Sequence, residues 1–123
     1  MKIYEAIERI DAIKHNTYTD NDKITWLSNL DGLIKKNIID THRWAEIVEF
    51  SGYTSDTPKD TELLVTAPYD EIYLHWLEAK IDFSNGEYSK YNNAIITYNT
   101  YYSDYANYYN RTHEPLSAGP FKF

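Results

Sequence analysis

The chain has no cysteine among its 123 residues. Without cysteine, a disulfide framework, thiolate catalysis and cysteine-bound zinc are excluded. Glycine is scarce too, at four residues, and the sequence contains no G-x-G-x-x-G, P-loop or G-x-S-x-G motif. The serines stand in no distinctive context. We therefore expect a protein that is not an enzyme, with no catalytic residues, no cofactor and no bound metal.

Long hydrophobic runs are also missing. No stretch approaches about eighteen consecutive apolar residues, so the sequence predicts no membrane-spanning helix. The first residues, MKIYEAIERIDAIKHN, place acids within their apolar pattern and offer no small-residue cleavage site, which is unlike a signal peptide. Hydrophobic residues make up 42% of the chain and charged residues 25%. These proportions, at this length, are typical of one folded domain.

Positive charge is in short supply. Twelve lysines and arginines face nineteen aspartates and glutamates, which gives a net charge of −7. Seven of the cations and nine of the acids lie in residues 1–50, which leaves five cations and ten acids for residues 51–123. Residues 91–110 contain no lysine or arginine. Because binding to phosphate backbones needs clustered cations, often interleaved with stacking rings, we expect no specific nucleic-acid binding.

Apolar residues recur at helical spacing through most of the chain. In the first segment, for example, Ile3, Ile7 and Ile10 fall on one helical stripe. Thr19 or Asp20 can cap the helix that follows. The pattern predicts a mainly α fold, a single helical domain over residues 1–113. Its helices are expected at about 1–15, 20–39, 41–50, 67–85 and 87–111.

The tyrosine-rich segment YNTYYSDYANYY (98–109) belongs to a longer regular pattern. Spacings alternate between three and four residues, as in a heptad repeat. The residues on this stripe, which we call the hairpin seam, are Tyr88, Tyr91, Ile95, Tyr98, Tyr102, Tyr105 and Tyr109. The turn signal Asn85-Gly86 predicts that helix 87–111 packs antiparallel on helix 67–85 as a long C-terminal αα-hairpin. A buried tyrosine needs a partner for its hydroxyl, so we expect a half-hydrated seam at a groove or a subunit contact.

Two segments lack an obvious partner in the predicted helical domain. Residues 51–66 read as a loop followed by a short β-prone arm, ELLVT, which could be an edge strand. Residues 114–123 form an extended tail, because Pro115, Gly119 and Pro120 exclude a helix. The apolar tail residues either fold back or dock on a neighbour. The predicted interface residues are Leu63, Leu64, Val65, Leu116, Phe121 and Phe123.

A metal site is the alternative that the histidines leave open. His75 has Glu71 four residues before it and Glu78 three residues after it, so one helix face can carry all three side chains. A di-iron helical bundle needs Glu-x-x-His on two helices, whereas Leu74 stands three residues after Glu71. A partly exposed histidine beside two solvated acids also explains the pattern. A metal-binding helical enzyme using these three residues remains the alternative.

A resemblance to a known family rests on three stretches. They are WLSNLDGLIKKNIIDTH (26–42), ELLVTAPYDEIYLHWLEAKIDFSNGEYSKYNN (62–93) and YYNRTHEP (108–115). These stretches resemble small proteins from the head-morphogenesis clusters of tailed phages and prophages, mostly of AT-rich Gram-positive hosts. The family is that of the head–tail connector proteins, also called adaptor or head-completion proteins. The resemblance covers most of the chain.

The resemblance implies a helical subunit of a homo-oligomeric ring, typically of twelve copies, in the neck between capsid and tail. Such a ring contacts the portal protein on one side and a tail-side neck or tail terminator protein on the other. DNA passes through it without specific binding, and the subunits reach the virion from the host cytoplasm. The family has no catalytic residues to carry over. It implies interface roles for residues 51–66 and 114–123. A monomeric binding module that uses the tyrosine seam as a peptide groove is a further alternative.

Overall fold

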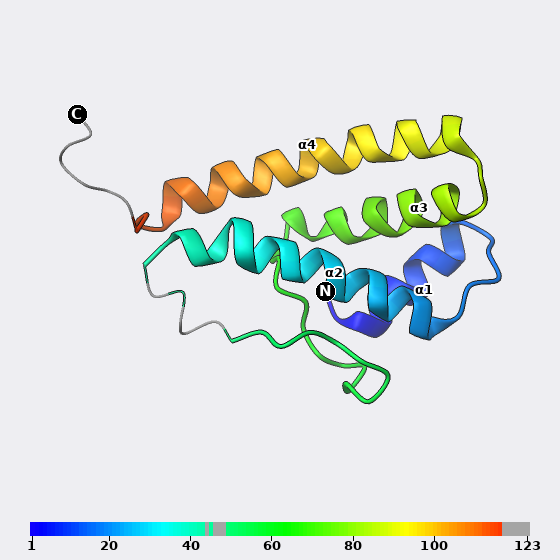
Figure 1. Ribbon diagram of the computed structural model, residues 1–123, viewed down its shortest axis with the longest axis horizontal. Helices are drawn as coiled ribbons and strands as arrows, with labels where there is room; N and C mark the ends of the chain where they lie inside the picture. The colour runs from blue at the N-terminus through cyan, green and yellow to red at the C-terminus, as the bar shows by residue number, and fades with distance from the viewer. Residues whose placement is uncertain (44, 46–48, 117–123) are drawn as a thin grey trace.

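The computed structural model describes residues 1–43, 45 and 49–116, which form a helical domain (Figure 1). This confirms the predicted mainly α fold with a C-terminal helical hairpin. No helix in this described part is long and apolar enough to cross a bilayer. The α-helices are α1 (Ile3–Ile13), α2 (Asp20–Asn37), α3 (Ile72–Ser84) and α4 (Tyr88–Thr112), with short 3₁₀ turns at Ile39–Thr41 (η1) and Tyr69–Glu71 (η3).

Helix α2 begins at a capping box. The Asp22 N–H donates to the Thr19 hydroxyl at 3.1 Å, and the Thr19 N–H donates to the Asp22 carboxylate at 3.2 Å. Two N–H groups that the helix leaves unpaired are thereby satisfied. Lys35 and Lys36 lie in the last turn, where positive charge complements the helix dipole. The cap fixes where α2 starts, and so which of its faces meets the core.

Helices α3 and α4 run antiparallel along one side of the molecule, with α1 and α2 beneath them (Figure 1). The turn between them contains Gly86 at a φ of 75°, a left-handed conformation that glycine adopts without strain. The Gly86 N–H donates to Phe83 O at 3.0 Å, and the Glu87 N–H donates to Asp82 O at 2.9 Å. These bonds satisfy the last carbonyls of α3 and reverse the chain.

The core lies between α1, α2 and α3, and α4 covers α3. Aliphatic side chains dominate it, with three tyrosines from α4 closing one side. Its buried members include Ile3, Ile7, Ile10, Ile24, Leu27, Leu30, Ile34, Ile72, Leu77, Ile81, Tyr98, Tyr105 and Tyr109. The apolar stripes expected for α1 and α2 therefore face this core, which sets the orientation of the hairpin.

The β-prone arm pairs with the N-terminus of its own chain. The Ile3 N–H donates to Thr61 O at 3.0 Å, and the Leu63 N–H donates to Met1 O at 2.9 Å. Lys2 and Glu62 form an isolated antiparallel bridge, and no longer strand occurs within residues 1–43 and 49–116. Backbone groups that could have paired with a neighbouring subunit are thus used within the chain.

Within residues 41–50, where a helix is expected, the described residues Thr41 and Ala45 are in 3₁₀ conformation. The turn η1 ends at Thr41, and residues 42, 43, 49 and 50 are not helical. Residues 44 and 46–48 lie outside the described residues. The Arg43 N–H donates to Glu114 O at 2.7 Å, and the Leu116 N–H donates to Thr41 O at 2.9 Å. Residues 41 and 43 are thus paired with the start of the tail.

Candidate interaction surface

The hairpin seam is buried at one end and open at the other. Tyr98, Tyr105 and Tyr109 are buried, whereas Tyr88 is 59% exposed. The remaining seam residues, Tyr91, Ile95 and Tyr102, are half-buried. Burial raises the pKa of Tyr98 and of Tyr105, and neighbouring tyrosines raise it further, so both phenols stay protonated. The seam therefore opens toward the turn that joins α3 and α4.

Aromatic pairs hold α4 against α3 and η3. The rings of Trp76 and Tyr98 have centroids 5.0 Å apart, and Tyr69 lies 4.9 Å from Tyr108. The Trp76 indole N–H donates to the carbonyl of Trp26 in α2 at 2.8 Å. Each such ring pair stabilises a fold by about 0.5–1.5 kcal/mol beyond its buried area. Trp76 is thus fixed by contacts with both α2 and α4.

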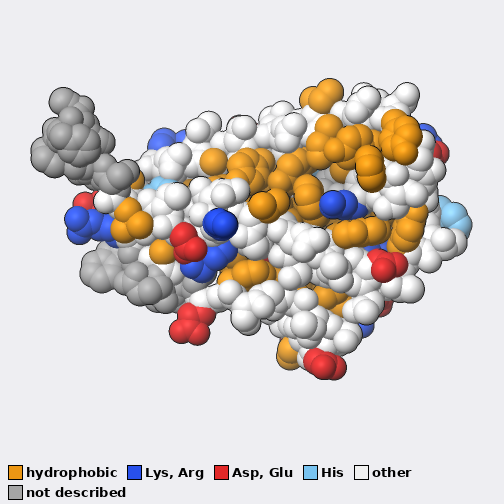
Figure 2. Space-filling view, viewed as in Figure 1, with side chains coloured by type: hydrophobic (Ala, Val, Ile, Leu, Met, Phe, Trp, Pro, Cys, Tyr) orange, Lys and Arg blue, Asp and Glu red, His pale blue; other side chains and the backbone are white. Residues whose placement is uncertain are grey.

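An apolar hollow lies on the open part of the hairpin. We call it the aromatic groove. It has a volume of about 190 Å³, and its lining is Trp76, Ala79, Lys80 and Phe83 of α3 with Tyr91 and Ile95 of α4. Phe83 is 55% exposed, and Tyr88 packs on it with ring centroids 5.7 Å apart. Figure 2 shows hydrophobic side chains gathered in a band over α3 and α4. Exposed apolar surface that is contiguous in this way is a candidate for an interaction surface.

The groove continues toward α2. Trp76 and Lys80 also line a wider, shallow depression with Gly32 and Leu33 of α2. Leu33 is 43% exposed. The ammonium group of Lys80 lies 4.7 Å from the centre of the Trp76 ring, a cation–π contact. The depression on α2 is largely polar, because its lining also includes Ser28, Asn29, Lys35, Lys36 and Asp40.

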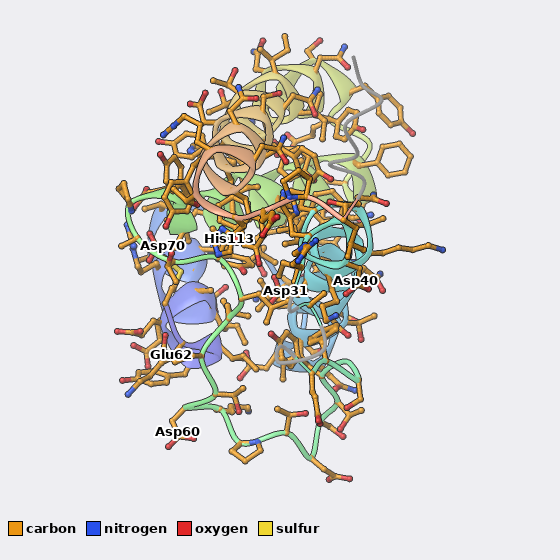
Figure 3. All side chains as sticks on the ribbon, turned by 90° about the vertical axis from the view of Figure 1, so that its left-hand side faces the viewer. Asp31, Asp40, Asp60, Glu62, Asp70 and His113 are labelled. Atoms are coloured by element: carbon orange, nitrogen blue, oxygen red, sulfur yellow. The ribbon has the colours of Figure 1, made fainter. Side chains whose placement is uncertain are left out.

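A buried carboxylate, Asp31, ties the core together, and sequence reasoning missed it. The hydroxyls of Tyr53 and Tyr73 donate to it at 2.5 Å and 2.6 Å, and the Leu64 N–H donates at 3.1 Å. Asp31 lies in the interior, whereas Asp60 and Glu62 lie on the exposed part of the 51–66 segment (Figure 3). The available signal was its position on the apolar stripe of α2, between Leu27 and Ile34.

Burial governs the electrostatics of this cluster. It raises the pKa of the Asp31 carboxyl, and the three hydrogen bonds that it accepts offset the rise only in part. Burial also raises the pKa of Tyr53 and of Tyr73, and the charge of Asp31 raises both further. Both phenols therefore stay protonated and act as donors. The side chains of Asp31, Tyr53 and Tyr73 are buried, and their hydrogen bonds join α2, α3 and the 51–66 segment.

His42 anchors the root of the tail. Its ring is 1% exposed, with Nδ1 2.6 Å from Ile38 O and Nε2 2.9 Å from Asn110 Oδ1. His113 stacks on Tyr109 with ring centroids 3.7 Å apart. The backbone of His42 forms an antiparallel bridge with Pro115. The start of the tail is thereby fixed to the C-terminal end of α4.

The residues of the alternative metal site are not brought together. Glu71 accepts a hydrogen bond from the Arg9 guanidinium at 2.8 Å. His75 Nδ1 lies 3.8 Å from Glu78 Oε1, and the His75 ring lies against Tyr101. Within the described residues, no three histidine, aspartate or glutamate side chains gather at metal-binding distance.

A second buried carboxylate, Asp82, borders a polar hollow on another side of the hairpin, and sequence reasoning missed it too. Asp82 is 1% exposed, and its Oδ1 accepts from the Lys14 ammonium at 2.7 Å. Its Oδ2 has no hydrogen-bond partner among the described residues. Lys90 and Glu78 also line this hollow. The hairpin thus has an apolar groove and, separately, a polar hollow.

The predicted interface residues are placed differently from one another. Leu63 and Val65 are 4% and 0% exposed, so they pack in the core of their own chain and cannot also contact another subunit. This corrects the expectation for those two residues. The physical reason is that the Leu64 and Val65 N–H groups bind Asp31 and the Tyr73 hydroxyl, which draws the arm inward. Leu64 is partly buried, Leu116 is 62% exposed, and Phe121 and Phe123 lie outside the described residues.

The chain was compared with protein-family models, with curated proteins and with solved structures. No protein-family model, no curated protein and no solved structure matches it. Two described features therefore bear on function. They are the exposed aromatic groove and the anchored root of an apolar tail.

Proposed function

We propose that this chain is a structural protein of a tailed-phage neck, which forms a homo-oligomeric ring between portal and tail. The ring continues the DNA channel and docks the tail, with the portal protein and a tail-side neck or tail terminator protein as partners. It works in the neck of the virion, after assembly in the host cytoplasm. The proposal is supported by the three stretches that resemble connector proteins. They cover most of α2, the 62–66 arm, α3 and both ends of α4.

The observation that carries the proposal is the exposed aromatic groove. Phe83, which lines this apolar groove, is 55% exposed, and Leu33, which lines the adjoining depression, is 43% exposed. Burying one such side chain at a contact stabilises it by about 1.5–3 kcal/mol. A subunit contact over α3 and α4 makes use of this surface, and closed rings arise when such contacts repeat.

The charge of the chain suits a DNA conduit. A net charge of −7 repels phosphate groups, so DNA would slide past the ring instead of binding to it. No chemical step is needed for this role. The proposed function is assembly, in which the subunit supplies the contacts between copies and the wall of the channel.

A matched pair of substitutions tests the role of the groove. Phe83→Ser removes an exposed ring inside it, whereas Ile96→Ser removes a 63% exposed side chain of α4 that does not line it. Light scattering on size-exclusion fractions should show at least about tenfold weaker self-association for F83S, equivalent to about 1.4 kcal/mol. I96S should associate as the unaltered chain does. Equal behaviour of both variants, at equal helix content, contradicts the proposal.

The same groove would also serve a monomeric binding module, which is the competing function. A monomer at every concentration, even with a portal protein present, would favour that module. The metal-binding alternative has less support, because Glu71 is paired with Arg9. If it were correct, a chelator would lower the melting temperature of the native protein.

A further inference from the structure

We propose that the polar hollow beside α3 binds a guanidinium group, with the carboxylates of Asp82 and Glu78 as its acceptors. The hollow lies on another side of the hairpin from the aromatic groove, so this inference goes beyond the ring contact proposed above and does not depend on it. The guanidinium comes either from a separate molecule or from Arg111 of a second copy, and one substitution distinguishes these two sources.

Three helices contribute to the hollow. Its lining includes Lys14 just beyond α1, Glu78 and Asp82 of α3, and Lys90 and Asn93 of α4. Figure 1 shows the end of α1 close to the turn that joins α3 and α4. The hollow has a volume of about 340 Å³, at the lower end of the range of about 300–1,000 Å³ that is typical of small-ligand sites. It therefore has room for a guanidinium group and a short alkyl chain.

Asp82 offers a buried acceptor that has no donor in its own chain. The side chain is 1% exposed, and its Oδ1 accepts from Lys14 Nζ at 2.7 Å, whereas Oδ2 has no hydrogen-bond partner among the described residues. Buried carboxylate oxygens without a donor are rare, because nothing then compensates their loss of hydration. The carboxylate turns readily about χ2, which exchanges its two oxygens between Lys14 and the hollow. A donor in the hollow therefore completes the hydrogen bonding of Asp82.

The charges around the hollow favour a cation. Lys14 pairs with Asp82, and Lys90 pairs with Glu87 at 3.2 Å. Glu78 forms no ion pair with a lysine or arginine among the described residues. The two lysines thus leave an excess of one negative charge, which is that of Glu78.

A guanidinium suits these acceptors better than other cations do. Glu78 and Asp82 stand one helical turn apart on α3, so their Cβ atoms are about 5–6 Å from each other on one face. A guanidinium carries five N–H donors in one plane, so a single group can donate to both carboxylates. An ammonium is a compact point charge, and Lys14 already places one at Asp82. A metal ion fits less well, because no three histidine, aspartate or glutamate side chains of the described residues gather at metal-binding distance.

Arg111 is the arginine that a second copy can supply. Arg9 and Arg43 each pair with a glutamate of their own chain, whereas Arg111 forms no ion pair with the described residues. Fourteen helical positions separate Arg111 from Thr97, which is the lining residue of α4 nearest to it. That separation is about 21 Å along the helix, farther than an arginine side chain reaches. Arg111 can therefore enter the hollow of another copy but not that of its own chain.

Isothermal titration calorimetry of the full chain, with N-ethylguanidinium as the probe, tests the site. We expect saturable binding at millimolar concentrations and no binding of the neutral isostere N-ethylurea. Glu78→Gln, at a partly exposed position, should weaken the binding at least about tenfold, because it removes a charged acceptor. The matched control is Asp104→Asn, at an exposed acid of α4 that does not line the hollow, and it should bind as the unaltered chain does. Asp82→Asn should also abolish the binding, with its helix content checked by circular dichroism.

Arg111→Ala identifies the source of the guanidinium. Equal binding of the probe by R111A and by the unaltered chain shows that the hollow is open to a guanidinium of a separate molecule. Binding by R111A alone shows that Arg111 of a second copy occupies the hollow, and E78Q and D104N are then compared in the R111A chain. No binding by either chain, equal binding of N-ethylurea, or equal affinity in E78Q and D104N overturns the inference. The ring contact is tested separately by F83S, so either proposal can fail without the other.

Discussion

The hydroxyl group of Tyr73 joins α2 to the arm at residues 62–66. It donates to Asp31 Oδ1 at 2.6 Å and accepts from the Val65 N–H at 2.8 Å. The second oxygen of Asp31 accepts from the Tyr53 hydroxyl and from the Leu64 N–H. One carboxylate therefore positions two loop segments and a helix, which is why the arm packs inward.

Removing this carboxylate should be strongly destabilising. Asp31→Ala leaves two buried hydroxyls and one N–H without an acceptor, so we expect a loss of about 3 kcal/mol or more in the free energy of unfolding. Urea denaturation followed by circular dichroism measures it. Asp104→Ala, at an exposed acid of α4, should change stability by less than about 0.5 kcal/mol. Similar losses in both variants would show that the cluster contributes little.

The raised pKa of Asp31 predicts a definite pH dependence. A carboxyl group whose pKa is higher in the folded state binds its proton more tightly there. Its contribution to the free energy of unfolding therefore falls as pH rises from the ordinary pKa of 3.8 toward the raised pKa. Asp31→Asn lacks this contribution. The stability of the unaltered chain relative to D31N should thus decrease with pH over that window. A relative stability that increases instead would mean that the hydrogen bonds outweigh burial.

The contact between His42 and Asn110 should stabilise the pairing of residues 41–43 with the start of the tail. His42→Ala removes the ring that links Ile38 O to Asn110, at a cost of about 2 kcal/mol. It should also speed hydrogen exchange at the Arg43 and Leu116 amides, which pair across the same contact. His15→Ala, at an exposed histidine, is the control. Unchanged hydrogen exchange at both amides in H42A would show that the His42 imidazole does not hold the start of the tail in place.

Two truncations should distinguish the anchored and the distal parts of the tail. A chain that ends at Leu116 keeps both backbone hydrogen bonds to residues 41–43, so its stability should stay within about 0.5 kcal/mol of the full chain. A chain that ends at His113 loses both bonds and should be about 1–2 kcal/mol less stable, yet still folded. Both should assemble poorly. Unfolding of the chain that ends at Leu116 would show that residues 117–123 belong to the core of their own chain.

The helices could be predicted from the sequence because their signals are local. The isoleucine stripe of α1, the Thr19 cap of α2 and the Asn85–Gly86 turn each lie within a few neighbouring residues. The heptad spacing of tyrosines likewise placed α4 against α3. Local spacing is enough where a helix needs only one apolar face.

The pairings between distant segments could not be predicted in this way. Asp31 and Tyr73 are 42 positions apart, and nothing near either residue specifies the other. The 62–66 arm reads as β-prone, but whether it pairs with another subunit or with Lys2 depends on three-dimensional proximity. The aromatic groove could not be predicted for the same reason, because its lining comes from both helices of the hairpin. The heptad spacing of the hairpin seam predicted which face of α4 meets α3, but it did not predict which end of the seam is exposed.

The central claim is that copies of this chain assemble through the exposed face of the hairpin. Native mass spectrometry of the full chain, with electron microscopy of the same sample, tests it most directly. The account predicts a closed ring whose mass is a multiple of 14.5 kDa, about twelve copies by resemblance to connector proteins, and its loss in F83S but not in I96S. A single 14.5 kDa species at every concentration, with and without portal protein, would contradict it.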